Sequence, residues 1–395
     1  MENVSEMDLV QLYYMLLLNE KYGKEIQYDM DSVWNNISKY YYLDNHVYTS
    51  DKIKLGLWIK ETVRYQLLDM LMCEVYSKFV NDDGLINKKD EFFVANYNEV
   101  INMMRTHTKN IDEQPKKVAL PEMTKQEVVR TVKDILENID PSGEWLEVYE
   151  KIRNECILYL NEYSREAILA LEELTGIDLT NDDANACVII NEQKGYLLLN
   201  YTGTILDVVT TIHEVSHYIC RYKNDFKEET PLLSEFYAIF YEMYAINYLE
   251  KKGYAKEALE SIQKERSLLM KKGIDQRKDL IDYFMMFMEK GEILETDDVG
   301  YNKYYRCDKA INDLIDNPYI LHDYYPYVIG SYLASKATKN MKNDKLLLPL
   351  IKHIVENIKA TDPYDVFYVL GCGNNNLVRA NDTLKDVKVK KKEKK

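Results

Sequence analysis

The most constraining feature of the sequence is the pattern His-Glu-x-x-His at residues 213–217. Side chains at positions i and i+4 of a helix project from one face, one turn apart, so both imidazoles can reach one ion. Glu214 follows His213 and lies about 100 degrees round the helix, where its carboxyl can touch a water on that ion without binding the ion. The pattern therefore requires a helix here and predicts a zinc site with His213 and His217 as ligands.

The residues around the pattern also follow helical spacing. Thr204 is a candidate N-cap, and Asp207 stands three residues later, as in a capping box. A stripe of apolar residues predicts the buried side of the helix, on a different face from the histidines: Ile205, Val208, Ile212, Val215 and Ile219.

A catalytic zinc usually has three protein ligands and one open position for water. The extended pattern HExxHxxGxxH is excluded as the source of the third ligand, because Cys220 and Lys223 occupy its later positions. A carboxylate from another segment is therefore needed. A structural zinc site, which requires four ligands and is usually rich in cysteine, has no suitable spacing in this sequence.

The segment 230–253 is predicted to be a helix that supplies this carboxylate. It starts with Thr-Pro and ends with Lys-Lys-Gly. Between 231 and 249 its only charged residues are Glu235 and Glu242, seven apart and hence on one face. Burying a lone carboxylate costs several kcal/mol unless a cation or hydrogen bonds compensate. We therefore expect Glu235 to be the third ligand and Glu242 to orient a ligand imidazole; the alternative is that both pair with lysines or face solvent.

The rest of the chain predicts a mainly α-helical fold. All eight prolines lie at or after residue 115, so the first 114 residues can form long helices. The segments 186–191 (ACVIIN) and 196–201 (YLLLNY) predict one β-hairpin next to the zinc helix. The polar stretch 106–127 is the expected boundary, giving an N-terminal helical region (1–112), a catalytic domain (113–384) and a basic tail (385–395).

Charge and composition exclude several classes of protein. A net charge of −15 argues against general nucleic-acid binding, and the basic tail is typical of a solvated end. No stretch approaches 18 uncharged apolar residues, and the N-terminal apolar run lacks the flanks of a signal peptide. The six scattered cysteines, without a C-x-x-C pair, are typical of a reducing compartment, so we expect a cytoplasmic protein.

The run YLLLNYTGTILDVVTTIHEVSHYI, followed by SEFYAIFYE, resembles the thimet oligopeptidase and oligoendopeptidase F family of zinc peptidases. The resemblance is clear over 194–250 and extends towards 335. The interval of seventeen residues between His217 and Glu235 is shorter than is usual in that family. The matching residues are Asn200, Tyr201, Thr204, Asp207, His213, Glu214, His217, Glu235 and Glu242.

The resemblance implies a two-lobed helical metallopeptidase with one zinc ion, supported by Glu242 and Asp207, that cleaves oligopeptides. It also implies that strand 196–201, with a free edge, aligns an extended peptide, and that the substrate contacts Asn200, Tyr201 and Gly203. The segment HDYYPYVIGSYLA (322–334) is similar to the family's His- and Tyr-rich active-site segment. The candidate oxyanion donors there are His322, Tyr325, Tyr327 and Tyr332, and which phenol acts is left open.

Two other functions are compatible with the sequence. A zinc aminopeptidase shares the HExxH pattern and distant glutamate, although the Gly-x-Met-Glu-Asn strand of those enzymes is missing here. A catalytically inactive peptide-binding protein could keep the same helices.

Overall fold

The computed structural model describes most of the chain. The described residues are 6–23, 28–80, 86, 90–109, 111, 118–153, 156–175, 179, 185–191, 194–226, 230–293, 302–318, 320–342, 344–372 and 376–379. The basic tail predicted at 385–395 and the hairpin turn at 192–193 lie outside these ranges.

The chain divides into two compact units, each made of two stretches of sequence. The first comprises residues 1–85 and 275–323, and the second comprises residues 86–274 and 324–395. The division therefore does not fall at residue 112, where the composition changes. The reason is that helices α11 (Lys278–Lys290) and α12 (Asn302–Asp316) pack on α3 (Lys52–Ser77), near the start of the chain. A change in composition can indicate a polar linker. A compact unit is instead defined by contacts between segments that can lie far apart in the sequence.

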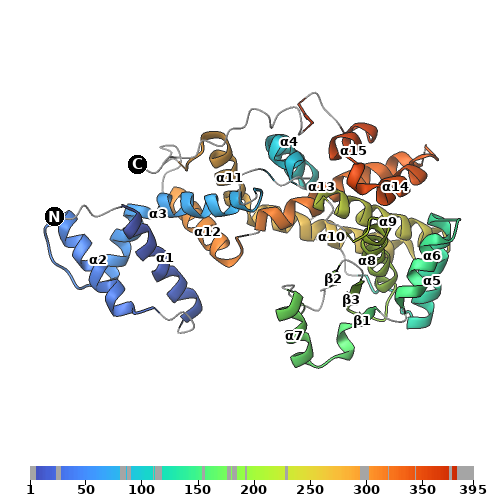
Figure 1. Cartoon of the computed structure of the whole chain (residues 1–395), viewed down its shortest axis with the longest axis horizontal. Helices are drawn as coiled ribbons and strands as arrows, with labels where there is room; N and C mark the ends of the chain where they lie inside the picture. Colours follow the sequence, from blue (N-terminus) through green and yellow to red (C-terminus); the bar gives the residue numbers. More distant parts are fainter. Residues whose placement is uncertain are drawn as a thin grey trace. The chain divides into compact units, whose positions relative to one another are not determined.

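The first unit is built of helices joined by loops in its described residues (Figure 1). Asp51 caps α3 by accepting hydrogen bonds from the backbone N–H groups of Ile53 and Lys54. Apolar residues at helical spacing along α3 are buried, which gives the unit its core. Its remaining N-terminal helices are α1 (Glu6–Tyr22) and α2 (Met30–Asn45).

The second unit surrounds one central helix, α8 (Leu206–Lys223), which carries the His-Glu-x-x-His pattern. Four helices and two strands contact α8: α5 (Lys125–Ile139), α6 (Glu144–Arg153), α9 (Pro231–Lys251), α14 (Leu347–Glu356), β2 (Ala186–Asn191) and β3 (Lys194–Leu199). Every residue from Asp207 to Cys220 is consequently buried, and Ile205 is buried too, so the whole predicted apolar stripe is inside. The helices of this unit are α4 (Glu91–Thr108), α5 (Lys125–Ile139), α6 (Glu144–Arg153), α7 (Arg165–Thr175), α9 (Pro231–Lys251), α14 (Leu347–Glu356), α15 (Pro363–Val369), and most of α10 (Lys256–Gln276) and α13 (Ile320–Met341).

A three-stranded sheet lies beside α8, in the strand order β1-β3-β2 (Figure 1). The predicted hairpin is confirmed: β2 (Ala186–Asn191) and β3 (Lys194–Leu199) are antiparallel. The strand β1 (Ile157–Tyr159) was not predicted, because three residues are too short to show a period; it pairs in parallel with β3. The prediction of a free edge along 196–201 was therefore wrong, since β3 is the central strand and is paired on both sides.

Two predictions about the whole chain can be compared with the structure. Within the described residues, no helix combines the length and the apolar character that crossing a bilayer requires. None of the six cysteines, all of which are described, forms a disulfide.

Candidate metal centre

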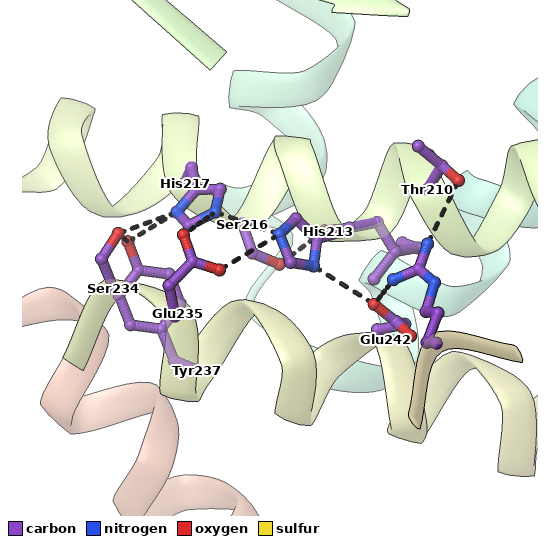
Figure 2. A network of polar contacts seen from close by, with 10 residues as sticks. Thr210, His213, Ser216, His217, Ser234, Glu235, Tyr237 and Glu242 are labelled. Atoms are coloured by element: carbon purple, nitrogen blue, oxygen red, sulfur yellow. Dashed lines mark hydrogen bonds and ion pairs between the residues drawn. The ribbon is translucent and has the colours of Figure 1, made fainter. Parts of the chain in front are cut away.

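Helices α8 and α9 pack side by side and in opposite directions, and together they form the candidate metal centre (Figure 2). His217 of α8 lies beside Glu235, near the start of α9, and His213 lies beside Glu242, two turns later. The two histidines, four residues apart on α8, therefore face the two glutamates, seven residues apart on α9. Pro231 begins α9, as the Thr-Pro start of the segment predicted.

Three side chains converge on one point. The Nε2 atoms of His213 and His217 are 3.2 Å apart. One carboxylate oxygen of Glu235 is 3.7 Å from Nε2 of His213, and the other is 3.7 Å from Nε2 of His217. Each of the three residues offers a ligand atom within 4.8 Å of the other two. The structure thus brings together the three residues that the sequence predicted as zinc ligands.

The outer nitrogens of both imidazoles are held by other groups. Nδ1 of His213 lies 3.2 Å from Oε2 of Glu242. Nδ1 of His217 lies 2.9 Å from the hydroxyl oxygen of Ser234 and 3.5 Å from that of Tyr237. These contacts orient both rings so that their Nε2 atoms face Glu235, which is the arrangement that ligand histidines need.

The donor set fits a zinc ion. Tetrahedral zinc with Zn–N bonds of about 2.0–2.1 Å places two ligand nitrogens roughly 3.3 Å apart, and the two Nε2 atoms are 3.2 Å apart. Two imidazoles and one carboxylate match the composition of catalytic rather than structural zinc sites. Burial, together with the charges of His217 and Arg266, lowers the pKa of His213 well below its usual value, so this imidazole is neutral, as a ligand must be.

Glu214 is buried next to these ligands, on the side of strand β2. Its side chain accepts a hydrogen bond from the backbone N–H of Cys187. The carbonyl of Cys187 accepts a hydrogen bond of 3.1 Å from Arg221. Burial raises the pKa of Glu214 to about 7, against the opposing effects of Arg266, Arg221 and the Cys187 N–H. A carboxyl group with this pKa can both accept and release a proton near neutral pH.

Asp207 anchors the loop between β3 and α8. Its carboxylate accepts hydrogen bonds of 2.8, 2.8 and 3.1 Å from the backbone N–H groups of Thr202, Gly203 and Thr204. Gly203 has φ +72°, a conformation that glycine adopts without strain. Helix α8 begins at Leu206, so Thr204 precedes its N-cap position. Asp207 thus acts on the start of the helix by holding the loop that precedes it.

The predicted substrate-binding residues of this loop take part in internal hydrogen bonds. The N–H of Asn200 donates to the side chain of Asn185 at 2.8 Å. The hydroxyl of Tyr201 donates to the carbonyl of Met123 at 2.6 Å. Asn200 and Tyr201 also line a small pocket with Tyr159 and Asp207. These contacts fix the loop, and its role towards a substrate stays a prediction.

The four candidate oxyanion donors all lie on α13, in different surroundings. His322 belongs to the first unit, where its ring lies 5.3 Å from that of Phe79. The other three belong to the second unit. Tyr325 is buried, and its hydroxyl donates to Asp90 at 3.3 Å.

The remaining two tyrosines differ in exposure. Tyr332 packs edge-on against His107, with ring centroids 5.5 Å apart, and forms a hydrogen bond with Cys372. Tyr327 is 46 % exposed. It is the most accessible of the three phenols.

Helix α13 passes very close to α9 at the predicted ligand Glu235. A Cβ atom added to Gly330 would lie 2.8 Å from the backbone nitrogen of Phe236 and 2.9 Å from the carbonyl carbon of Glu235. Only glycine allows this approach without displacing backbone. Tyr327 is three residues before Gly330 and therefore shares its side of α13.

Sequence reasoning missed several residues that the structure adds to this site. Ser234 and Tyr237 contact His217, and Arg266 of α10 forms an ion pair with Glu242. Gly330 carried a detectable signal, because a glycine in the middle of a helical segment is unfavourable unless close packing requires it. Arg266 carried none, since it is one of many charged residues on a polar helix.

No protein-family model and no curated protein matches the chain. Among solved structures, a protein assigned as oligoendopeptidase F from Bacillus anthracis str. Ames matches with a TM-score of 0.48 and 11 % identity, over 95 % of this chain and 64 % of that one.

Two other solved structures give similar values. PZ peptidase A, in a complex with an inhibitor, has a TM-score of 0.45 and 13 % identity, covering 83 % of this chain and 63 % of that one. A protein assigned as a peptidase from Chlamydophila abortus has a TM-score of 0.42 and 13 % identity, covering 90 % and 61 %. This chain therefore spans less than two thirds of the length of each of these proteins.

Proposed function

We propose that this protein is a zinc-dependent peptidase that hydrolyses peptide bonds in oligopeptides. The observation that carries the proposal is the convergence of two imidazole Nε2 atoms and the Glu235 carboxylate, with a second buried carboxyl, Glu214, next to one of the ligands. Two histidines and a glutamate leave one position of a tetrahedral ion for water, which a structural site would fill with protein.

Different residues are proposed to bind the zinc ion and to transfer the proton. His213, His217 and Glu235 would hold one zinc ion, which supplies polarisation of a carbonyl and a lowered pKa for water. Glu214 takes the proton from the water that attacks the peptide carbonyl. It then returns this proton to the leaving nitrogen, so that the C–N bond breaks to give a free amine and a new carboxyl group, which ionises at neutral pH.

Tyr327 is the proposed hydrogen-bond donor to the oxyanion of the tetrahedral intermediate. Two observations support this choice over Tyr325 and Tyr332. Tyr327 is the most exposed of the three at 46 %, whereas Tyr325 is buried and Tyr332 is partly buried. Tyr327 also lies on the side of α13 that approaches α9 through Gly330.

The decisive experiment is the substitution Glu214→Gln in the full chain. Glutamine keeps the size of the side chain but cannot take a proton, so peptide cleavage should fall by a factor of about 10²–10⁴. Zinc content and affinity should stay within a few-fold of wild type, because Glu214 is not a ligand. Glu257→Gln, at an exposed position on α10, is the matched control and should change neither quantity.

Cleavage is measured by digesting a mixed peptide library with the zinc-loaded protein and identifying the products by mass spectrometry. Internal fragments would indicate an endopeptidase, and release of single N-terminal residues would indicate the aminopeptidase alternative. Stoichiometric zinc without any cleavage would support the inactive peptide-binding alternative. An unchanged rate for Glu214→Gln would reject the role of this residue as the base.

A further inference from the structure

Arg266 connects α10 to both helices of the candidate metal centre. Its guanidinium forms an ion pair with Glu242 on α9, and Nη2 is 3.4 Å from the hydroxyl of Thr210 on α8. Glu242 in turn lies 3.2 Å from Nδ1 of His213. Figure 2 shows Thr210 and Glu242 at one end of this network and His217 with Ser234 at the other.

One carboxylate oxygen of Glu242 contacts both His213 and Arg266. Oε2 contacts Nδ1 of His213 and the guanidinium of Arg266. The carboxylate is therefore held from two sides, and its position relative to the His213 ring depends on the position of Arg266. On the His217 side, the hydroxyls of Ser234 and Tyr237 contact the outer nitrogen of the ring.

Charge gives a second reason for Arg266 at this position. The side chain of Glu242 is 4 % exposed, and a carboxylate so far from water needs a compensating cation. His213 cannot supply one, because a metal ligand must be a neutral imidazole. Arg266 supplies this charge.

The guanidinium has a geometry suited to this role. Arginine carries several N–H donors in a fixed plane, so it can contact Glu242 and Thr210 at once. The side chain is 31 % exposed, and besides its ion pair with Glu242 its charge interacts with the carboxyl groups of Glu214 and Glu235. Lysine would carry the same charge without the planar fork.

We propose that Arg266 is a positioning residue for the metal centre, which acts through Glu242 to hold the His213 imidazole with Nε2 facing the other two ligands. The inference rests on the proposed zinc-binding function of His213, His217 and Glu235. It adds to that function a contribution from α10, a helix that provides no ligand.

The test is a double-mutant cycle on zinc affinity. Zinc dissociation constants are measured by competition with a chromogenic chelator for wild type, Arg266→Gln, Glu242→Gln and the double variant. Loss of a group that orients a ligand typically lowers metal affinity by about 10–100-fold. We expect this loss for each single variant, and we expect the double variant to be no weaker than the weaker single variant, since both act on one contact.

Two further variants separate positioning from simple support of the fold. Lys264→Gln changes a 62 % exposed cation on the same helix and should leave zinc affinity unchanged. Arg266→Lys keeps the charge and should retain part of the affinity that Arg266→Gln loses. The metal-free unfolding midpoint is recorded for every variant, and where Arg266→Gln does not fold, the cycle is measured with Arg266→Lys.

The outcomes distinguish this inference from the proposed function. If wild type binds no zinc, the proposed function fails and the inference fails with it. If wild type binds zinc and the Arg266 variants bind it equally well, only the inference is overturned. Multiplicative losses in the double variant would also overturn it, because Arg266 would then act independently of Glu242.

Discussion

The close approach of α13 to α9 makes Gly330→Ala a sensitive test of how the metal centre is built. The new Cβ would lie 2.8 Å from the Phe236 nitrogen and 2.9 and 3.0 Å from the carbonyl carbon and Cβ of Glu235. These are largely backbone atoms, which cannot rotate away as the tip of a side chain can. The substitution must therefore move one helix relative to the other at a predicted zinc ligand.

Gly56→Ala is the matched control. Both glycines lie inside helices, but the nearest atom to a Cβ at Gly56 is the ring carbon Cη2 of Trp34 at 3.7 Å, an ordinary contact. Replacing glycine by alanine in a helix is favourable by about 0.5–1 kcal/mol. Overpacking a tight interface costs about 1–3 kcal/mol. Both variants share the stabilisation from replacing glycine by alanine in a helix. The destabilisation from overpacking at Gly330 should therefore equal the difference in stability between the two variants.

We expect Gly56→Ala to be slightly more stable than wild type, and Gly330→Ala to be about 1–3 kcal/mol less stable than Gly56→Ala. Urea unfolding followed by circular dichroism measures both. The zinc affinity of Gly330→Ala should also fall at least about tenfold, as for groups that orient a ligand, while that of Gly56→Ala should not change. If Gly330→Ala matched Gly56→Ala in stability and in zinc affinity, the described helix crossing would be incorrect.

Two further predictions concern groups that support the fold around the site. Asp207→Ala removes the acceptor for three loop N–H groups and should cost about 2 kcal/mol of stability, with faster amide exchange at Gly203 and Thr204; unchanged exchange would contradict the anchoring role. Burial disfavours ionisation of Asp140, but hydrogen bonds from Lys352, Ser142 and Trp145 outweigh this effect and lower its pKa from 3.8 to about 2. Because the folded-state pKa is the lower one, this stabilisation is present above about pH 4 and is lost as the pH falls through 2. The difference of about 2 kcal/mol expected between wild type and Asp140→Asn at pH 7 should therefore shrink over that range in urea titrations, and a constant difference would contradict it.

The composition of the candidate ligand group could be predicted because its parts are encoded locally. The i, i+4 spacing of His213 and His217 places both imidazoles on one face of any helix that contains them. The seven-residue spacing of Glu235 and Glu242 does the same for α9, whose start at Pro231 also has a local signal. The two histidines and Glu235 can form one group only if α8 and α9 pack together, and in the structure these two helices are in contact.

The hairpin of β2 and β3 was predicted correctly from its own residues, whereas the free edge implied by the family resemblance was wrong. Two short apolar runs separated by a polar turn indicate this hairpin, and both are local properties. The pairing of β3 with β1 joins residues about forty positions apart through a strand of three residues. No short sequence pattern predicts such a contact. Only the tertiary structure therefore shows that β3 is not an edge strand.

The sequence by itself determined which side chains share a face of each helix, because helical and strand periodicities depend only on neighbouring residues. The tertiary structure decided which faces meet. It placed Arg266 behind Glu242, set Gly330 against the backbone at Glu235, and enclosed α8 so completely that its histidines and carboxylate are buried. These contacts join residues far apart in the chain, and their formation depends on the packing of whole helices, which local spacing does not encode.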